Sequence, residues 1–274
     1  MECGQSFRWQ PINGWYYGVV EGRQLKIRQE NQTLIVESSA DEAADRLEVF
    51  LRHYLDLNRD LQAILDAVNI DPFIRRSIET FRGMRILNQE VWECLASFIL
   101  SQNNNVPRIK GIIRTISARF GEKIALDDSV DYSFPVPQAL AEAGVETLYD
   151  CGLGYRAPYL WTVSSTIVAG EFDPEALKSL PYAEAKQELM GFKGIGEKVA
   201  DCICLFSLGH VQALPIDVWV KRIIEQLYLK REASIREIRQ FAENYFGEHL
   251  GYAQQYLFHY ARTVGLENLL ESER

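Results

Sequence analysis

The chain has 274 residues, a formal net charge of −9 and a pI of about 5.1, with 47% hydrophobic and 24% charged residues. This length allows one large domain or two to three smaller ones, and the composition is that of an ordinary soluble globular protein. No stretch approaches the roughly 18 consecutive apolar residues of a membrane helix, and the start, "MECGQSFRWQ", is not a signal peptide. We therefore expect an intracellular protein without a membrane partner.

The five cysteines follow no disulfide pattern, and Cys202 and Cys204 do not form the C-x-x-C of a zinc or redox site. With only four histidines and no H-E-x-x-H, we expect no metal and no other cofactor. The acidic charge argues against a nucleic-acid partner, because phosphate binding usually relies on clustered Lys and Arg. A local basic patch can outweigh that global sign.

The first predicted elements are short strands. "WYYGVV", "LKIRQ" and "TLIVE", within residues 15–37, are β-branched or aromatic runs separated by turn residues. From Ala40 onward the pattern is helical. The sequence predicts a β-rich region over 1–40 and a helical body over 41–274, an α+β fold, with helices at 58–69, 72–82, 89–101, 106–120, 137–143, 156–169, 182–191, 197–208, 217–229, 234–247 and 251–264.

The segment "PYAEAKQELMGFKGIGEKVADCICLFSL", residues 181–208, predicts two helices joined by a glycine hairpin. A dinucleotide fingerprint must follow a strand, and a P-loop needs Gly-Lys-Ser/Thr, so both alternatives fail. Backbone N–H groups at the start of the second helix favour phosphate binding without side-chain charge. A plain helical hairpin remains the competing interpretation.

Lys198 and Asp217 are the candidate chemical groups. Lys198 lies in the first turn of the second helix, where the helix dipole disfavours a cation and so favours the neutral amine that a nucleophile requires. Asp217 follows "ALPI" and is predicted to cap the helix that starts after it. Simple capping would explain Asp217 equally well.

These residues resemble the 8-oxoguanine DNA glycosylase family of the helix-hairpin-helix superfamily. The motifs are "GFKGIGEKVADCICL" with "LPIDVWV", together with "GQSFRW", "SQNNNVPRIKG", "GLGYRA" and "YAQQYLF" in the same order. The resemblance implies a helix-hairpin-helix glycosylase body and a partner, double-stranded DNA containing 8-oxoguanine. We expect a monomer that is associated with DNA inside the cell.

The resemblance also implies a mechanism. Lys198 would attack C1′ of the damaged nucleotide and expel the base, and the resulting Schiff base would permit strand cleavage by β-elimination. Asp217 would stabilise the oxocarbenium-like sugar. The nucleotide must first leave the duplex; Asn103 and Tyr155 would fill the gap, and Arg108 and Arg156 would read the cytosine left unpaired. From their position in or beside the glycine hairpin, rather than from the resemblance, we expect Lys193, Gly194 and Gly196 to hold the DNA backbone.

For the flipped base, the resemblance implies one discriminating group and a surrounding pocket. 8-Oxoguanine carries an N7–H donor where guanine has an acceptor, and the Gly4 carbonyl would accept from it. Cys202 and Phe258 would sandwich the base, Gln254 would meet its Watson–Crick edge, and Trp219 would lie beside it. Taken alone, Phe258 is better explained as a core residue, and Asn103 as part of a polar helix terminus.

Two positions depart from the family pattern: Trp219 stands where relatives often carry His, and Phe206 where Met is common in the eukaryotic proteins. Endonuclease-III-like and adenine glycosylases carry four C-terminal cysteines for an iron–sulfur cluster, and no Cys follows Cys204 here. Glycosylases for alkylated bases usually lack the lysine. A non-catalytic DNA-binding hairpin, or a glycosylase for another damaged base, remains the alternative function.

Overall fold

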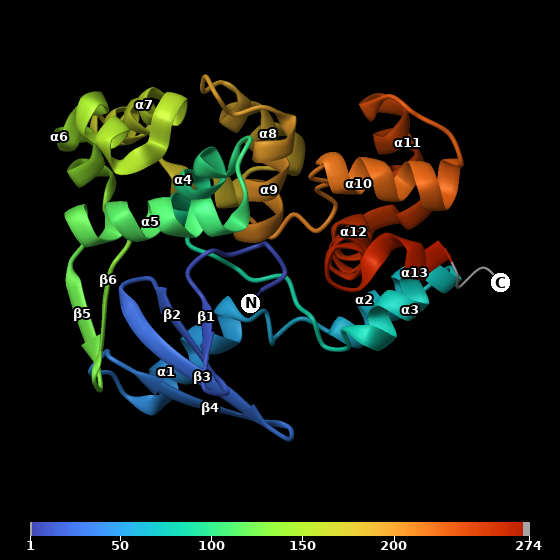
Figure 1. Cartoon of the computed structure of the whole chain (residues 1–274), viewed down its shortest axis with the longest axis horizontal. Helices are drawn as coiled ribbons and strands as arrows, with labels where there is room; N and C mark the ends of the chain where they lie inside the picture. The colour runs from blue at the N-terminus through green and yellow to red at the C-terminus, as the bar shows by residue number, and fades with distance from the viewer. Residues whose placement is uncertain (1, 271–274) are drawn as a thin grey trace. The chain divides into compact units, whose positions relative to one another are not determined.

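The computed structural model describes residues 2–270 and divides into two compact units, which interleave along the chain (Figure 1). Unit 1 holds the residues up to Val49 together with Gln89–Leu180 and Glu188–Ile195. Unit 2 holds Phe50–Asn88, Pro181–Gln187 and the residues from Gly196 onward. Among the described residues, none of the helices combines the length and the apolar character needed to span a bilayer.

The N-terminal part of unit 1 is a four-stranded antiparallel sheet with strand order β1-β2-β3-β4, shown in blue in Figure 1. Its strands are β1 (Gln10–Ile12), β2 (Trp15–Val20), β3 (Arg23–Glu30) and β4 (Thr33–Ser38). The three strands predicted within residues 15–37 are therefore confirmed, and β1 adds a short edge strand that the sequence pattern did not indicate. Gly18 of β2 pairs with Leu25 of β3. A Cβ at Gly18 would lie 2.5 Å from the ring of Trp9, which is fully buried, so glycine lets this ring pack on the sheet.

A second sheet corrects the expectation that the chain stays helical after Ala40. Strands β5 (Lys123–Leu126) and β6 (Ser129–Tyr132) form an antiparallel hairpin, and β5 contacts β3. Each strand is only four residues long and carries no fully buried side chain. Such short, half-exposed strands give no clear hydrophobic alternation, which explains why the sequence did not predict them.

The helical part of unit 1 is built around one buried helix. In α4, every residue from Val91 to Leu100 except Glu93 is buried. A helix that is apolar on all sides belongs at the centre of a core, and α4 contacts both α5 and α7. The helices of this unit are α4 (Val91–Ser101), α5 (Val106–Phe120), α6 (Pro137–Leu148) and α7 (Ala157–Val168), with the short turns η1 (Tyr149–Leu153), η2 (Gly154–Arg156) and η3 (Pro174–Ser179).

Unit 2 is helical throughout the part that the structure describes, and α12 forms its core. Leu250–Leu257 is continuously buried, and α12 contacts α2, α3, α10 and α11. The remaining elements are α2 (Leu61–Val68), α3 (Pro72–Thr80), α9 (Glu197–Ser207), α10 (Val218–Ile223), η4 (Ile224–Leu229), α11 (Ile235–Phe246), η5 (Gly247–His249), α12 (Leu250–Tyr260), η6 (Ala261–Gly265) and α13 (Leu266–Leu270). Two helices, α1 (Ala44–Tyr54) and α8 (Tyr182–Met190), run from one unit into the other. The predicted helices are confirmed, with ends that differ by a few residues.

Candidate active site

The predicted helix–hairpin–helix is present as α8, a glycine turn and α9. Gly196 is the N-cap of α9 in an extended conformation, and Lys198 follows in the first helical turn. Gly194, on the unit 1 side of the turn, has φ +93°, and a Cβ there would lie 2.4 Å from the ring of Tyr159. Glycine is thus required at Gly194 for both backbone and packing reasons. Lys193 is exposed beside it.

Lys198 is half-buried, and its amine donates a hydrogen bond to the Cys202 thiol one turn further along α9. Burial is the main reason why the pKa of Cys202 is raised to about 11, and the charge of Asp217 raises it further, whereas Lys198 lowers it. The thiol therefore stays protonated near neutral pH and adds no negative charge beside the amine. The Cys202 thiol thus lies within electrostatic range of both Lys198 and Asp217 inside unit 2.

Asp217 caps α10, as its sequence context predicts. Its Oδ1 accepts hydrogen bonds from the backbone N–H groups of Trp219 at 2.9 Å and Val220 at 2.8 Å. Both bonds go to the same carboxylate oxygen, so Oδ2 remains available to face a substrate. The two backbone N–H groups at the start of α10 therefore hold the carboxyl group in a fixed orientation. Capping and a chemical role are therefore compatible in this residue.

Three further predicted residues of unit 2 lie on α10 and α12. Gln254 is buried, and its Oε1 has no hydrogen-bond partner within residues 2–270. A buried amide oxygen without a partner is costly, so this atom is suited to accept from a ligand. Phe258, one turn later, is half-buried with the Arg262 guanidinium 5.2 Å from its ring centroid. Trp219 is also half-buried, and Arg222 lies 5.2 Å from its ring.

Three residues after Lys198, Asp201 forms a buried ion cluster that joins α9 to α8. Asp201 is completely buried and accepts from the Tyr182 hydroxyl at 2.5 Å. Its carboxylate also pairs with Lys186 at 3.0 Å and with Arg239 at 2.8 Å. This cluster was not predicted, although an Asp in the apolar run "VADCICLF" indicates that a buried partner exists.

In unit 1, the motif "NNN" joins α4 to α5 and carries another group of predicted residues. Asn103 has φ +45°, and its Nδ2 donates to the Tyr155 hydroxyl at 3.2 Å. Asn105, by contrast, is the N-cap of α5 and accepts from the Arg108 backbone N–H. The structure therefore brings together the two residues expected to fill the gap in the DNA, and both are exposed.

The two arginines of unit 1 differ sharply. Arg156 is only 4% exposed, and its guanidinium donates to the backbone carbonyls of Gln102 and Asn103 while lying 4.4 Å from the Tyr155 ring centroid. Arg108 is exposed, and its side chain has no polar partner in the described chain. In this structure Arg156 fixes the Asn103 loop, while Arg108 is free to meet a ligand. The Gln102 carbonyl, which anchors both Arg156 and Tyr155, was not predicted.

Gly4 lies in the loop that leads to the buried Trp9. It is half-buried with φ +83°, between the buried side chains of Cys3 and Gln5. The Gln5 amide donates to the Cys3 sulfur at 3.0 Å, and the Gln5 carbonyl accepts from Gln89 at 2.6 Å. The backbone around Gly4 is therefore held in a defined conformation.

Comparison with known proteins agrees with this geometry. Residues 1–95 match the family described as 8-oxoguanine DNA glycosylase, N-terminal domain, and residues 96–248 match the HhH-GPD superfamily base excision DNA repair proteins. A probable N-glycosylase/DNA lyase of Methanothermobacter thermautotrophicus is 30% identical over 94% of this chain and 90% of its own length.

Two solved structures are similar over nearly their full length. One is MBOgg1 in complex with a low-affinity DNA ligand, at 40% identity and a TM-score of 0.92, covering 96% of this chain and 91% of that one. The other is the Clostridium acetobutylicum 8-oxoguanine glycosylase/lyase with duplex DNA containing cytosine opposite 8-oxoguanine, at 36% identity and a TM-score of 0.90, covering 96% and 90%. The chain belongs to the HhH-GPD superfamily of base excision DNA repair proteins and, within it, to the 8-oxoguanine DNA glycosylases.

Proposed function

We propose that this protein is a bifunctional DNA glycosylase that excises 8-oxoguanine from duplex DNA and nicks the strand at the resulting site. The observation that carries the proposal is that Lys198, an amine in the first turn of α9, and Asp217, the carboxylate that caps α10, both act electrostatically on the same thiol, Cys202. Family membership supplies the substrate class.

In the proposed reaction, the nitrogen lone pair of Lys198 attacks C1′ while the bond between C1′ and the base breaks. The electron pair of that bond leaves with the base, which takes up a proton. Asp217 stabilises the positive charge that develops on the sugar. The ring then opens to a protonated imine on Lys198, loss of a proton from C2′ follows, and the bond from C3′ to its phosphate oxygen breaks.

The damaged base is distinguished by hydrogen bonding. We propose that the Gly4 carbonyl accepts from N7–H of 8-oxoguanine, a donor that guanine lacks. The unpartnered Oε1 of Gln254 supports a role in accepting from the N–H groups on the Watson–Crick edge of the base. Phe258 and Cys202 would contact its two faces, with Trp219 next to them. A mismatched polar contact is worth about 1–3 kcal/mol, so these contacts act together.

DNA contacts are proposed on both units. Asn103 and Tyr155 occupy the gap left by the extruded nucleotide, and their mutual hydrogen bond keeps them together. Arg108 reads the unpaired cytosine, and Arg156 joins it only if it exchanges some of its bonds to backbone carbonyls. Lys193 and the hairpin amides from Gly194 to Gly196 hold the phosphates. We propose that the enzyme acts on DNA as a monomer.

Borohydride trapping tests the proposal, because reduction of the imine joins the protein covalently to DNA. The parent should form an adduct with a duplex containing 8-oxoguanine opposite cytosine, and Lys198→Gln should form none. Lys178→Gln is the matched control, since Lys178 is exposed and paired only with Glu175. Binding without any adduct by the parent would favour a non-catalytic DNA-binding module. An adduct only with another damaged base would identify a glycosylase of different specificity.

A further inference from the structure

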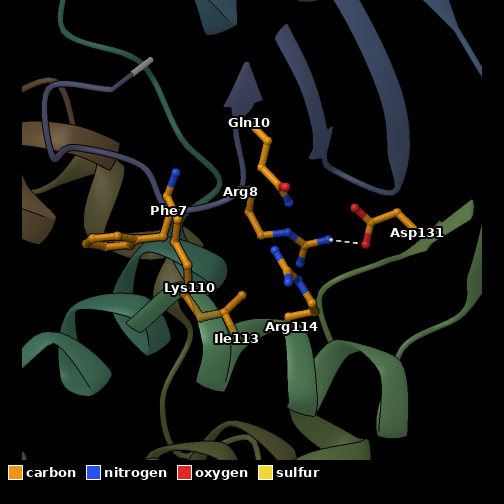
Figure 2. A pocket seen from close by; sticks show the side chains of 7 residues that line it. All are labelled: Phe7, Arg8, Gln10, Lys110, Ile113, Arg114 and Asp131. Carbon is orange, nitrogen blue, oxygen red and sulfur yellow. Dashed lines mark ion pairs between the residues drawn. The ribbon is translucent and has the colours of Figure 1, made fainter. Parts of the chain in front are cut away.

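A small hollow in unit 1 gathers positive charge away from the residues assigned above. It lies where the segment leading into β1 passes α5 and β6, and its polar lining is Arg8, Gln10, Lys110, Arg114 and Asp131 (Figure 2). Figure 2 shows the guanidinium groups of Arg8 and Arg114 next to each other, with Asp131 approaching Arg8 from the side of β6.

Two of the three cations are held in place by the fold. Arg8 is only 8% exposed, and its guanidinium donates to the Ser117 hydroxyl at 2.9 Å and to the Tyr132 carbonyl. The Lys110 amine donates to the Trp9 carbonyl at 2.8 Å. Little side-chain entropy remains to be lost if an anion binds to such fixed groups.

Arg114 completes the cluster and is not neutralised. It is exposed, and no hydrogen bond or ion pair involves its side chain within the described residues. It shares a face of α5 with Lys110, one turn away. The pKa of Lys110 is lowered first by burial and then by the charge of Arg114, while Glu2 acts in the opposite direction. Mutual repulsion of the two cations is what a bound anion would relieve.

The charge of α5 contrasts with that of the chain. Within Val106–Phe120 there are four basic residues and no acidic one, in a protein of net charge −9. The carboxylate among the residues that line the hollow is Asp131, whose Oδ1 lies 3.9 Å from the Arg8 guanidinium, longer than a direct hydrogen bond. With Asp131 beside Arg8 and the charge of Glu2 acting on Lys110, the surplus of positive charge rests on Arg114, which has no ion pair within the described residues.

We propose that this hollow is an anion site that receives one oxygen of a DNA phosphate outside the lesion. The space open to the centre of a water-sized group is about 20 Å³, which is about what one oxygen requires, so the rest of the phosphate stays in solvent. Planar guanidinium groups match phosphate oxygens in geometry and charge.

The occupant is a DNA phosphate because the substrate is itself a polyanion, and this step rests on the proposed function. Arg114 lies six residues after Arg108 on α5, about 9 Å along the axis, or between two and three base-pair rises of 3.4 Å. The two arginines lie on different faces of the helix. The hollow therefore adds a phosphate contact distinct from the contacts proposed at the start of α5.

The salt dependence of DNA binding measures this contact directly, because each phosphate contact releases counterions. The slope of log Kobs against log salt concentration becomes shallower by about 0.9 for each phosphate that the protein no longer neutralises. We expect the double variant Lys110→Gln/Arg114→Gln to have a slope about 0.9 shallower than the parent on duplex DNA. Arg114→Gln alone should give part of that decrease. Because Arg114 is exposed and makes no hydrogen bond or ion pair within the described residues, this single variant should fold normally even if the double variant does not.

Arg46→Gln is the matched control, since Arg46 is exposed on α1 and its side chain likewise has no partner in the described residues; its slope should equal that of the parent. Equal slopes for parent and double variant would overturn the proposal. A second outcome would also overturn it: inorganic phosphate stabilises the parent but not Arg114→Gln, while the slopes on DNA are the same for the parent and the double variant. That outcome would assign the hollow to a free anion. The slopes are also measured on undamaged duplex. Binding to undamaged duplex requires no base excision, so this test can be carried out even if borohydride trapping of the parent fails.

Discussion

At the residue scale, Asp217 combines two roles that one substitution separates. Asn is as good an N-cap as Asp, so Asp217→Asn should retain the bonds to the Trp219 and Val220 amides and change stability by only a few tenths of a kcal/mol. It removes the negative charge opposite the developing sugar cation, so single-turnover excision of 8-oxoguanine should fall at least about 100-fold, with duplex affinity retained. Excision by the variant at the parent rate would remove the proposed role.

Single residues also show what a sequence can and cannot predict. The cap at Asp217 and the placement of Lys198 depend on neighbours within a few positions, so local pattern was sufficient for both. Arg156 is different, because its partners are the carbonyls of residues 102 and 103, more than 50 positions away. A sequence motif identifies such a residue but does not say whether its charge is already engaged.

At the element scale, the Asp201 cluster should decide how firmly α9, and with it Lys198, is held. Asp201→Asn removes the buried carboxylate from Lys186 and Arg239, which are 16% and 19% exposed, and leaves them only the exposed Glu197 as a counter-charge. Breaking a buried pair by removing one partner costs on the order of 3–5 kcal/mol, which chemical denaturation will measure. We expect single-turnover excision to fall as well, since the helix that presents Lys198 is loosened.

The control for this prediction is Glu175→Gln at the Lys178–Glu175 pair, whose side chains are 46% and 55% exposed. Exposed pairs contribute about 0–1 kcal/mol, so stability should hardly change. If Asp201→Asn were as mild as this control, the cluster would contribute little to the stability of the hairpin.

The start of α4 provides a pH-dependent element. Glu90 occupies the N-cap position without making a side-chain cap, and its pKa is raised to about 7, chiefly by burial and further by Glu93, Glu21 and Glu175, with Lys178 opposing. The folded state holds the Glu90 proton more tightly than the unfolded state does. The contribution of this proton to the free energy of unfolding is therefore complete below pH 4.5 and is lost as the pH rises to about 7. The free energy of unfolding of Glu90→Gln should therefore rise relative to that of the parent as the pH increases through this window, by about 3 kcal/mol at most.

Unfolding curves at intervals between pH 4 and 8 test this expectation. The exposed Glu146→Gln on α6 makes the same chemical change without burial and should follow the parent at every pH. Parallel curves for Glu90→Gln and the parent would contradict the prediction.

Elements differ in how well their sequences specify them. The boundaries of α5 were predicted to the residue, because Asn105 caps its start and Gly121 follows its end. The β5–β6 hairpin was missed, since its strands depend on contact with β3 rather than on their own pattern. Long amphipathic or buried helices can be predicted from their own hydrophobic pattern, whereas short edge strands depend on contacts with the rest of the fold.

At the scale of the whole molecule, the net charge and the local charges have opposite signs where DNA would bind. A net charge of −9 predicts repulsion from DNA, yet the basic helix α5 and the amides of the hairpin offer local attraction. Composition alone therefore pointed away from the function, and the order of motifs pointed toward it. The interleaving of two units was not visible in the sequence, because each unit is assembled from segments far apart in the chain.

The cysteines allow the two units to be followed separately. All five are buried and take part in no disulfide, three of them (Cys3, Cys94 and Cys151) in unit 1 and two (Cys202 and Cys204) in unit 2. Burial raises the pKa of Cys202 to about 11 and that of Cys204 to about 12, so these two thiols stay protonated in the native state at pH 8, and burial shields all five from reagent. Pulsed thiol labelling should detect almost no reaction without denaturant.

With increasing denaturant, each unit should expose its own thiols as it opens, because a cooperative core protects the cysteines within it. We expect labelling in one group of three and one group of two, at different midpoints, with peptide mass spectrometry assigning the cysteines. A single midpoint shared by all five would show that the units unfold as one. Since Lys198 contacts Cys202, the midpoint of the second group also gives the denaturant concentration at which the nucleophile loses its surroundings.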